Sequence, residues 1–304
     1  MVSRTIPYID FLAIETQYHF LADERALAFS RYGKAGGTPV YYFHGCPGSR
    51  FEAAPCHEWA NKLGFEVFAL DRPGCGQSSQ ASAYQILDWP RDVLDFANHM
   101  SHERFGVMGL SGGGAYSQAC AYAIADRLLF AYDLAGWAPV TQVEELRSSL
   151  APLDQFFLQV ALSFRGLFQA PFALLGVAAK YLSDQGFANM LRSSMSDDDK
   201  AFIFGHANNA HFFRRIVRES FAQGSHGPAT DAMRCYRDWG FKLDDIKYPV
   251  QIWHGTNDHF ASFRFAQYKH RAIAGSSLRV FEGRGHLHLV TEYEALFKDM
   301  QTRY

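Results

Sequence analysis

One segment, residues 105–115, constrains the fold more strongly than any other part of the 304-residue chain. Its first half is a short apolar run, as expected for a strand buried on both faces of a sheet. Its second half is rich in small residues and begins a helix that we predict over 114–127. Ser111 therefore lies at the bend, where Gly109 and Gly113 leave room for strand and helix to approach closely. A G-x-S-x-G turn in this position is typical of a serine nucleophile, although a plain glycine-rich turn has the same composition.

Strand-like apolar runs alternate with helical patterns along much of the chain, which predicts parallel strands joined by helices. The first two strands are separated only by a short turn and are predicted to pair antiparallel at one edge. The predicted strands are 18–22, 25–32, 40–43, 65–70, 105–110, 128–134, 250–254 and 277–281, and the predicted helices are 52–63, 88–101, 114–127, 261–274 and 287–298. Residues 1–17 show no clear pattern, which leaves open either a helical lead-in or a poorly ordered arm. The sequence thus predicts an α/β fold with a mostly parallel central sheet.

The alternation of strands and helices is interrupted in the second half of the chain. Between 140 and 239 only helical patterns occur, with several clusters of Phe and Leu. We therefore predict a helical cap over 140–239, inserted between the two parts of one core at 1–139 and 240–304. Most of the cap's apolar residues are expected to form its own core, and some of them to line a pocket.

Composition excludes several classes of partner. The formal net charge of −2 and the absence of a basic stripe interleaved with aromatic residues give no reason to expect a nucleic acid. Five scattered cysteines favour free thiols in a reducing compartment. Residues 1–20 lack the apolar core of a signal peptide, and the longest apolar stretch, 166–179, is too short to span a membrane. We therefore predict a cytoplasmic protein without a membrane partner, and the sequence does not indicate its oligomeric state.

A serine hydroxyl is a poor nucleophile near neutral pH, so it requires a histidine base and an acid that orients the histidine. Asp258 follows the predicted strand 250–254, and His286 follows the predicted strand 277–281. Parallel strands end at the same edge of a sheet, and ligands bind at that edge. Ser111, Asp258 and His286 are therefore expected to converge there as a catalytic triad.

Each of these assignments has an alternative. Asp258 could instead cap the helix that starts near Ala261, and Asp133 is the alternative acid because its loop is expected at the same edge. His286 and His288 could both be surface residues or half of a metal pair. We favour His286 because Gly285 permits a loop bend before it, and we predict no metal because no third ligand has suitable spacing.

Backbone donors for an oxyanion are expected at two places. One is the N–H of Gly112, directly after the nucleophile and at the positive end of the helix dipole. The other lies in the loop 44–48, where Pro47 has no N–H and Cys46 is therefore the predicted donor. Cys46 is a weaker candidate for the nucleophile itself, because the residues around it describe a loop that offers backbone groups.

Five ordered motifs together resemble the α/β-hydrolase superfamily from about residue 18 to the end of the chain. They are His44-Gly45-Cys46-Pro47-Gly48, Asp71-Arg72-Pro73-Gly74-Cys75-Gly76-Gln77-Ser78, Gly109-Leu110-Ser111-Gly112-Gly113, Gly255-Thr256-Asn257-Asp258 and Gly285-His286. The resemblance is to small serine hydrolases, which include esterases, carbon-carbon hydrolases of aromatic ring-cleavage products and proline iminopeptidases. The chain departs from the iminopeptidases at Cys46, where they carry glycine, and at Pro73.

These observations predict a cofactor-independent serine hydrolase that cleaves a small to medium carboxylic ester, or a related acyl bond, through an acyl-enzyme. Its expected partner is a small molecule that is apolar near the scissile bond. The alternatives are a carbon-carbon bond hydrolase, a proline iminopeptidase-like aminopeptidase and a non-catalytic binding protein with the same fold. For the aminopeptidase, Glu144, Glu145 and Asp154 are available in the cap to hold a free amine.

Charged residues outside these motifs are predicted to have structural roles. The run Asp197-Asp198-Asp199 and the group Arg214, Arg215 and Arg218 are interpreted as solvated helix faces. Arg50 and Arg72 lie in loops near the expected site, where each could steer an anionic group or form a structural ion pair.

Overall fold

The computed structural model describes residues 5–303 and contains one eight-stranded sheet. In chain order the strands are β1 (Gln17–Phe20), β2 (Ala26–Gly33), β3 (Thr38–Phe43), β4 (Phe65–Leu70), β5 (Phe105–Leu110), β6 (Leu128–Leu134), β7 (Val250–Gly255) and β8 (Ser277–Phe281). Each corresponds to a predicted strand, and the boundaries differ by at most two residues.

The spatial order of the strands is β1-β2-β4-β3-β5-β6-β7-β8. β2 runs antiparallel to β1 and β4, and the remaining neighbours pair in parallel. The prediction of a mostly parallel sheet with an antiparallel edge is therefore confirmed. The central strands β4, β5 and β7 are buried along their whole length, which explains why they appear in the sequence as largely apolar runs.

The α-helices that the structure describes flank the sheet and fill the segment between β6 and β7. They are α1 (His57–Leu63), α2 (Trp89–His99), α3 (Gly113–Ala123), α4 (Glu144–Arg147), α5 (Pro152–Ser163), α6 (Gln169–Tyr181), α7 (Asp184–Met190), α8 (Asp197–Gly205), α9 (Ala207–Ser220), α10 (His226–Cys235), α11 (Phe263–Ala272) and α12 (Tyr293–Met300). Two predicted helices begin differently, because 3₁₀ turns precede α1 (η1, Arg50–Cys56) and α12 (η7, Leu287–Thr291). In η1 the reason is Pro55, which has no N–H for an α-helical hydrogen bond.

The sheet separates two hydrophobic cores. Successive strand residues point to opposite faces, so Val67 and Met108 belong to one core, while Phe68 and Val107 belong to the other. Residues of α2 and α3 complete the core around Phe68, and residues of α1 and α12 complete the core around Val67. The sheet is thus covered on both faces, as its parallel strands require.

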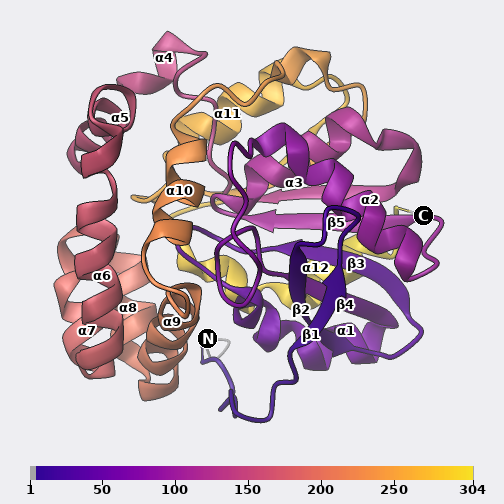
Figure 1. The fold of residues 1–304 in the computed structure, drawn as a ribbon, viewed down its shortest axis with the longest axis horizontal. Helices are drawn as coiled ribbons and strands as arrows, with labels where there is room; N and C mark the ends of the chain where they lie inside the picture. The colour runs from indigo at the N-terminus through magenta and orange to yellow at the C-terminus, as the bar shows by residue number, and fades with distance from the viewer. Residues whose placement is uncertain (1–4, 304) are drawn as a thin grey trace.

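The segment between β6 and β7 contains helices α4–α10 and, within the described residues, no strand. Figure 1 shows α5–α9 gathered on one side of the sheet, with α10 between the sheet and helices α5 and α6. These helices join both cores: Phe168 and Phe172 pack into one, and Phe187 and Phe212 into the other. We call α4–α10 the cap.

The chain before β1 contains no helix in its described part, and residues 1–4 lie outside the described residues. Ile6 is 1% exposed, and its N–H donates to Asn209 Oδ1 in α9 at 2.8 Å. The Phe11 ring packs against Phe51, with centroids 5.4 Å apart. For residues 5–16, both a helical lead-in and a poorly ordered arm were therefore wrong, because apolar side chains fix an irregular segment with one turn against the cap and η1.

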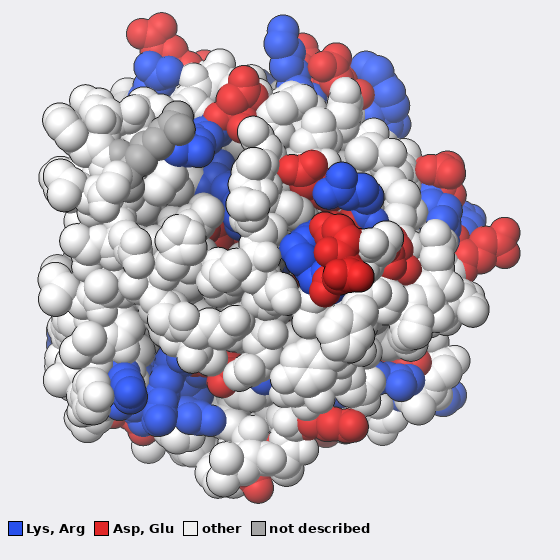
Figure 2. Space-filling model, in the orientation of Figure 1, with Lys and Arg blue, Asp and Glu red and all other residues white. Residues whose placement is uncertain are grey.

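Part of the cap surface is apolar. Large exposed hydrophobic side chains on α5, α6 and their connection include Leu153, Phe156, Leu162, Phe164, Leu167, Leu174, Val177 and Tyr181. Figure 2 shows few charged side chains on the side where these helices lie in Figure 1. None of the described helices is both long enough and apolar enough to cross a bilayer.

The close approach of β5 and α3 predicts that Gly109 cannot be replaced without a loss of stability. A Cβ on Gly109 would lie 2.1 Å from the backbone oxygen of Gly113, and backbone cannot move aside as a side chain can. We expect Gly109→Ala to lower the free energy of unfolding by on the order of 3 kcal/mol. Gly205→Ala is the control, because a Cβ there meets nothing within 4 Å, and it should be neutral or slightly stabilising. Equal denaturation midpoints for the two variants would contradict this account.

Candidate active site

Ser111 lies on a strained turn at the carboxyl end of β5. Its φ of +54° is in the left-handed region, which costs a non-glycine residue about 1–3 kcal/mol. Hydrogen bonds maintain it: the Ser111 N–H donates to Leu134 O at 2.9 Å, and the Ser111 carbonyl accepts from Gly114 and Trp137 at 3.0 Å each. The side chain is thereby directed away from the strand and lines a cavity.

Glycines around Ser111 permit two close backbone approaches. A Cβ on Gly113 would lie 2.1 Å from Phe43 O at the end of β3. A Cβ on Gly112 would lie 2.9 Å from Cys46 Cβ, so a side chain there would push the loop 44–48 away from Ser111. Gly112 thus has a packing role in addition to the predicted role of its N–H group.

His286 and Asp258 meet at the same edge. His286 Nδ1 lies 2.7 Å from Asp258 Oδ2, and the side chains are 8% and 0% exposed. Asp258 Oδ1 accepts the N–H groups of Phe260 and Ala261, both at 2.8 Å, and His254 Nε2 lies 3.3 Å from Asp258 Oδ2. Asp258 therefore binds the turn before α11 and does not cap that helix, whose N-cap is Ser262, so the alternative role was wrong. The same carboxylate contacts His286.

The environment sets the charges of this pair. Burial alone would raise the pKa of Asp258, but the charge of His286 and hydrogen bonds from His254 and His286 outweigh it and hold that pKa below its ordinary value. Burial likewise opposes the charged form of His286, yet the Asp258 charge and hydrogen bond raise the pKa of His286 above 6.5. The histidine is thus made a stronger base.

The alternative acid and the alternative histidine lie elsewhere. Asp133 is fully buried, and its Oδ2 accepts from Lys269 Nζ at 2.7 Å and from Gln118 Nε2. His288 is also fully buried, its Nδ1 lies 2.6 Å from Gly285 O, and burial lowers its pKa to about 4. Neither Asp133 nor His288 lines the cavity that contains Ser111.

Gly285 has a different purpose from the predicted loop bend. Its φ is not in the positive region, but a Cβ there would lie 2.2 Å from Ser196 Oγ and 2.4 Å from Asp199 Oδ2. Glycine is required because the amino terminus of cap helix α8 packs directly against the loop before His286.

The backbone donors predicted for an oxyanion lie side by side. The ideal Cβ position of Gly112 is 3.6 Å from Cys46 N. Among the described residues, neither the Gly112 N–H nor the Cys46 N–H has a hydrogen-bond acceptor. Burial raises the pKa of the Cys46 thiol well above its ordinary value, so this side chain is held in the protonated form and is poorly suited to act as a nucleophile.

Arg72 fixes the loop 44–48 by hydrogen bonds to its backbone carbonyls. Its guanidinium donates to the carbonyls of His44 and of Gly45, the latter at 3.0 Å, and to Asp231 of α10 at 2.7 and 2.9 Å. Arg50 pairs with Asp71 at 2.6 Å. Of the two roles considered for Arg50 and Arg72, the structure supports the ion pair.

The cavity has a volume of about 1050 Å³, is lined by core and cap together and opens to solvent on one side. Apolar side chains from the cap dominate its wall, among them Leu153, Phe157, Phe172, Leu174, Leu175, Phe187, Phe202, Phe212, Phe213 and Tyr236. Leu153 and Leu174 are also 54% and 73% exposed, so they lie where the cavity meets solvent.

Two further acids line the cavity. Glu52 is 5% exposed, its Oε2 accepts from Gly45 N at 2.6 Å and from Tyr42 Oη at 2.9 Å, and burial raises its pKa to about 7. Asp154 accepts from Tyr236 Oη at 2.7 Å, and burial raises its pKa to about 6. Glu144 and Glu145 are exposed and do not line the cavity.

Sequence reasoning missed the roles of several of these acids. Glu52 falls inside a predicted helix and carries no local signal. The interpretation of Asp197-Asp198-Asp199 as a solvated face was wrong for Asp199, which is fully buried. A signal was present, because Ser196 and Asp199 have capping-box spacing, and Ser196 Oγ does accept the Asp199 N–H at 3.1 Å. That signal marks where α8 starts but not what Asp199 contacts.

The model of the alpha/beta hydrolase family matches residues 40–299, and the chain belongs to this family. It is similar to the non-heme chloroperoxidase of Streptomyces lividans, with 25% identity over 92% of this chain and 96% of that protein. It is also similar to the proline iminopeptidase of Lactobacillus helveticus, with 23% identity over 95% of each. Among solved structures, an esterase from Exiguobacterium antarcticum superposes with a TM-score of 0.67 over 95% of this chain and 98% of that chain, at 18% identity. Family membership indicates a hydrolase and confirms the predicted resemblance and fold.

The contact between His286 and Asp258 predicts a change in titration. In Asp258→Asn the charge that raises the pKa of His286 is gone, so that pKa should fall below its value in the unaltered protein. NMR titration of the His286 ring would measure this shift. Asp133→Asn is the matched control: it leaves Lys269 without its counter-charge, so its cost should appear in stability while the His286 titration stays unchanged. A His286 titration that follows Asp133 instead would contradict the pairing.

Proposed function

We propose that this protein is a cofactor-independent serine hydrolase that cleaves a small to medium carboxylic ester, or a related acyl bond, through an acyl-enzyme. One observation carries the proposal: a histidine hydrogen-bonded to a buried aspartate and a serine on a strained turn line the same cavity. That combination supplies a base, an orienting acid and a nucleophile. The non-catalytic alternative gives no reason for the strain at Ser111.

In the proposed reaction, Ser111 Oγ attacks the substrate carbonyl while His286 Nε2 takes the hydroxyl proton. His286 then gives that proton to the leaving alcohol as the carbon–oxygen bond breaks. Water attacks the acyl-enzyme in the second half, with His286 again acting as base and returning the proton to Ser111. Asp258 favours the tautomer with its proton on Nδ1, which leaves Nε2 free to accept.

The N–H groups of Cys46 and Gly112 are proposed to stabilise the oxyanion in both halves. Their lack of other acceptors among the described residues supports this role. Gly112 precedes α3 directly, so the positive end of that helix dipole adds to the stabilisation. The raised pKa of Glu52, about 7, also fits the proposal, because it reduces the negative charge next to a developing oxyanion.

An aminopeptidase is the second candidate, favoured by the two acids outside the proposed triad. Asp154 lines the cavity from the cap and Glu52 lines it from the core, and either could accept a substrate ammonium group. The similarity to a proline iminopeptidase is in keeping with this candidate. We rank it second because both carboxyls have raised pKa values, which reduces their negative charge near neutral pH.

Covalent labelling tests the nucleophile. A fluorophosphonate should modify the unaltered protein on the peptide that carries Ser111, because the activated hydroxyl attacks phosphorus as it would a carbonyl. Ser111→Ala should not be labelled, and Ser117→Ala, which removes a buried hydroxyl in α3, should still be labelled. Intact-protein and peptide mass spectrometry would measure both. Labelling at another serine would refute the assignment, and no labelling at all would favour the binding protein.

The apolar wall of the cavity predicts a preferred acyl length. Each methylene that fits should improve binding by up to about 0.8 kcal/mol until the cavity is full, after which the gain should reverse. A series of p-nitrophenyl esters from acetate upward should therefore give a maximum in kcat/KM at intermediate length. Rates that continue to rise with long, aggregated chains would contradict a cavity of limited volume. A strong preference for free-amine aminoacyl substrates would instead select the second candidate.

A further inference from the structure

Buried carboxylates of the cap fix two of the loops that carry proposed catalytic groups, the loop before His286 and the loop 44–48. We propose that two cap residues are positioning residues: Asp199 of α8 positions His286, and Asp231 of α10 positions the loop 44–48, which we call the oxyanion loop. The cap would then fix the geometry of the catalytic groups in addition to covering the cavity. The inference rests on the proposed function for the roles of those two loops. It assigns a purpose to two acids that the proposed reaction itself does not use.

Asp199 binds the backbone on which His286 is mounted. Its Oδ1 accepts the N–H of Leu287 at 2.8 Å, and its Oδ2 accepts the N–H of His286 at 3.2 Å and the hydroxyl of Ser196 at 2.7 Å. The neighbouring Asp198 accepts the N–H of Gly285 at 2.9 Å. Three consecutive N–H groups around the histidine are therefore fixed by α8, which belongs to the cap and lies 87 residues away in sequence from His286.

Asp231 reaches the oxyanion loop through Arg72. Its two carboxylate oxygens accept Arg72 Nε at 2.9 Å and Nη2 at 2.7 Å, and Oδ1 also accepts from Tyr116 Oη at 2.8 Å. Arg72 and Asp231 are both fully buried. The same guanidinium donates to the carbonyls of His44 and Gly45, which directly precede the proposed donor Cys46. The orientation of the Cys46 N–H thus depends on a charge pair whose acid is on α10.

Other contacts make α10 an immediate neighbour of the site. A Cβ on Gly227 would lie 1.8 Å from Gly74 O, so the start of α10 packs backbone to backbone on the loop that carries Arg72. Cys46 Sγ lies 3.9 Å from Pro228 O. A displacement of α10 therefore cannot be absorbed by flexible side chains and must move the oxyanion loop.

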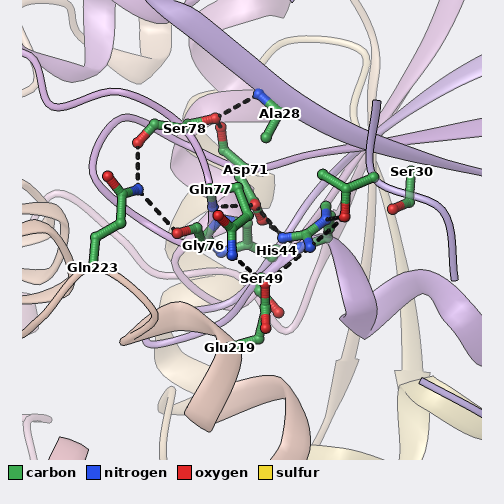
Figure 3. Close-up of polar contacts among 12 residues, drawn as sticks. Ala28, Ser30, His44, Ser49, Asp71, Gly76, Gln77, Ser78, Glu219 and Gln223 are labelled. Atoms are coloured by element: carbon green, nitrogen blue, oxygen red, sulfur yellow. Dashed lines mark hydrogen bonds and ion pairs between the residues drawn. The ribbon is translucent and has the colours of Figure 1, made fainter. Parts of the chain in front are cut away.

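A third polar contact between cap and core, less buried than the other two, provides a comparison. Glu219 of α9 accepts from Arg50 at 2.9 Å and from Gln77 at 3.3 Å, and Gln223 donates to Gly76 O and Ser78 O at 2.9 and 2.8 Å. Figure 3 shows how Glu219 and Gln223 approach Asp71 and the loop 76–78. None of these contacts is made to the His286 loop or to the carbonyls of His44 and Gly45. Glu219 thus also joins the cap to the core through a charge pair, but it does not contact the proposed catalytic loops.

The two positioning residues should have different signatures. Three acids raise the pKa of His286: Asp258 from the loop after β7, Asp199 from α8 and Glu52 from η1. Removing the Asp199 charge should move the ascending limb of the kcat/KM profile to lower pH, because His286 then loses its proton more readily. Removing the Asp231 charge should leave that limb in place and slow every step that develops an oxyanion.

The experiment compares Asp199→Asn, Asp231→Asn and the control Glu219→Gln in the full chain, with a p-nitrophenyl ester as substrate. We expect kcat to fall at least tenfold for the two aspartate variants with KM within about twofold, and to stay within about twofold for Glu219→Gln. Should either aspartate variant fold poorly, Arg72→Lys and Ser196→Ala keep both acids and loosen the same contacts, and they should lower kcat with less loss of stability.

Denaturant unfolding and NMR titration of His286 complete the test. The inference would be overturned if kcat fell in proportion to the loss of stability, by the same relation, in all three variants. It would also be overturned if the pKa of His286 were unchanged in Asp199→Asn. Failure of the proposed function looks different, because the unaltered protein would then resist fluorophosphonate labelling while the His286 titration would still respond to Asp199.

Discussion

The close approach of β5 to α3 is the constraint on which the remainder of the molecule depends. Gly109 and Gly113 let the backbone turn within a space that a single Cβ would fill, and this turn forces Ser111 into the left-handed region. The strain is sustained by hydrogen bonds to β6 and to the segment that follows it, so several elements share its cost. Everything else at the site is arranged around a serine whose position is already fixed by backbone.

Parallel topology then brings separate loops to that serine. β3, β5, β7 and β8 all end at one edge, and the loops after them carry Cys46, Ser111, Asp258 and His286. Loops are mobile unless something holds them, and here the restraint comes from buried charges. Each such charge is expensive to desolvate and is retained only with a complete set of partners, since removal of one partner costs about 3–5 kcal/mol. Arg72 illustrates this, because its donors are divided between the oxyanion loop and Asp231.

The sequence predicted the core of the fold well because that part depends on local patterns. Continuous apolar runs such as β4 and β5 and the glycine spacing around Ser111 are visible without any tertiary information. The candidate site residues on loops were predicted from topology, since strand ends can be aligned from their order. The parts that were missed depend on contacts between distant segments. Asp199 and Asp231 are polar residues in an all-helical region, and nothing local distinguishes a buried carboxylate that binds a loop from a solvated one such as Asp197.

This difference also explains why the cap is hard to interpret from sequence. A cap that only covered a cavity would need apolar residues at helical spacing on the face toward that cavity. On α5 and α6, apolar residues such as Leu and Phe are also exposed to solvent, so the apolar pattern of these helices does not identify the face that lines the cavity. Three cap helices also make polar contacts with the core: α8, α9 and α10 each contribute a carboxylate whose partner lies in a core loop or in η1. Burial of a carboxylate is unfavourable in isolation, so its position must be matched to its partner's. The cap therefore has an outer part that depends mainly on apolar contacts, and an inner part whose position is fixed by charged contacts with the core.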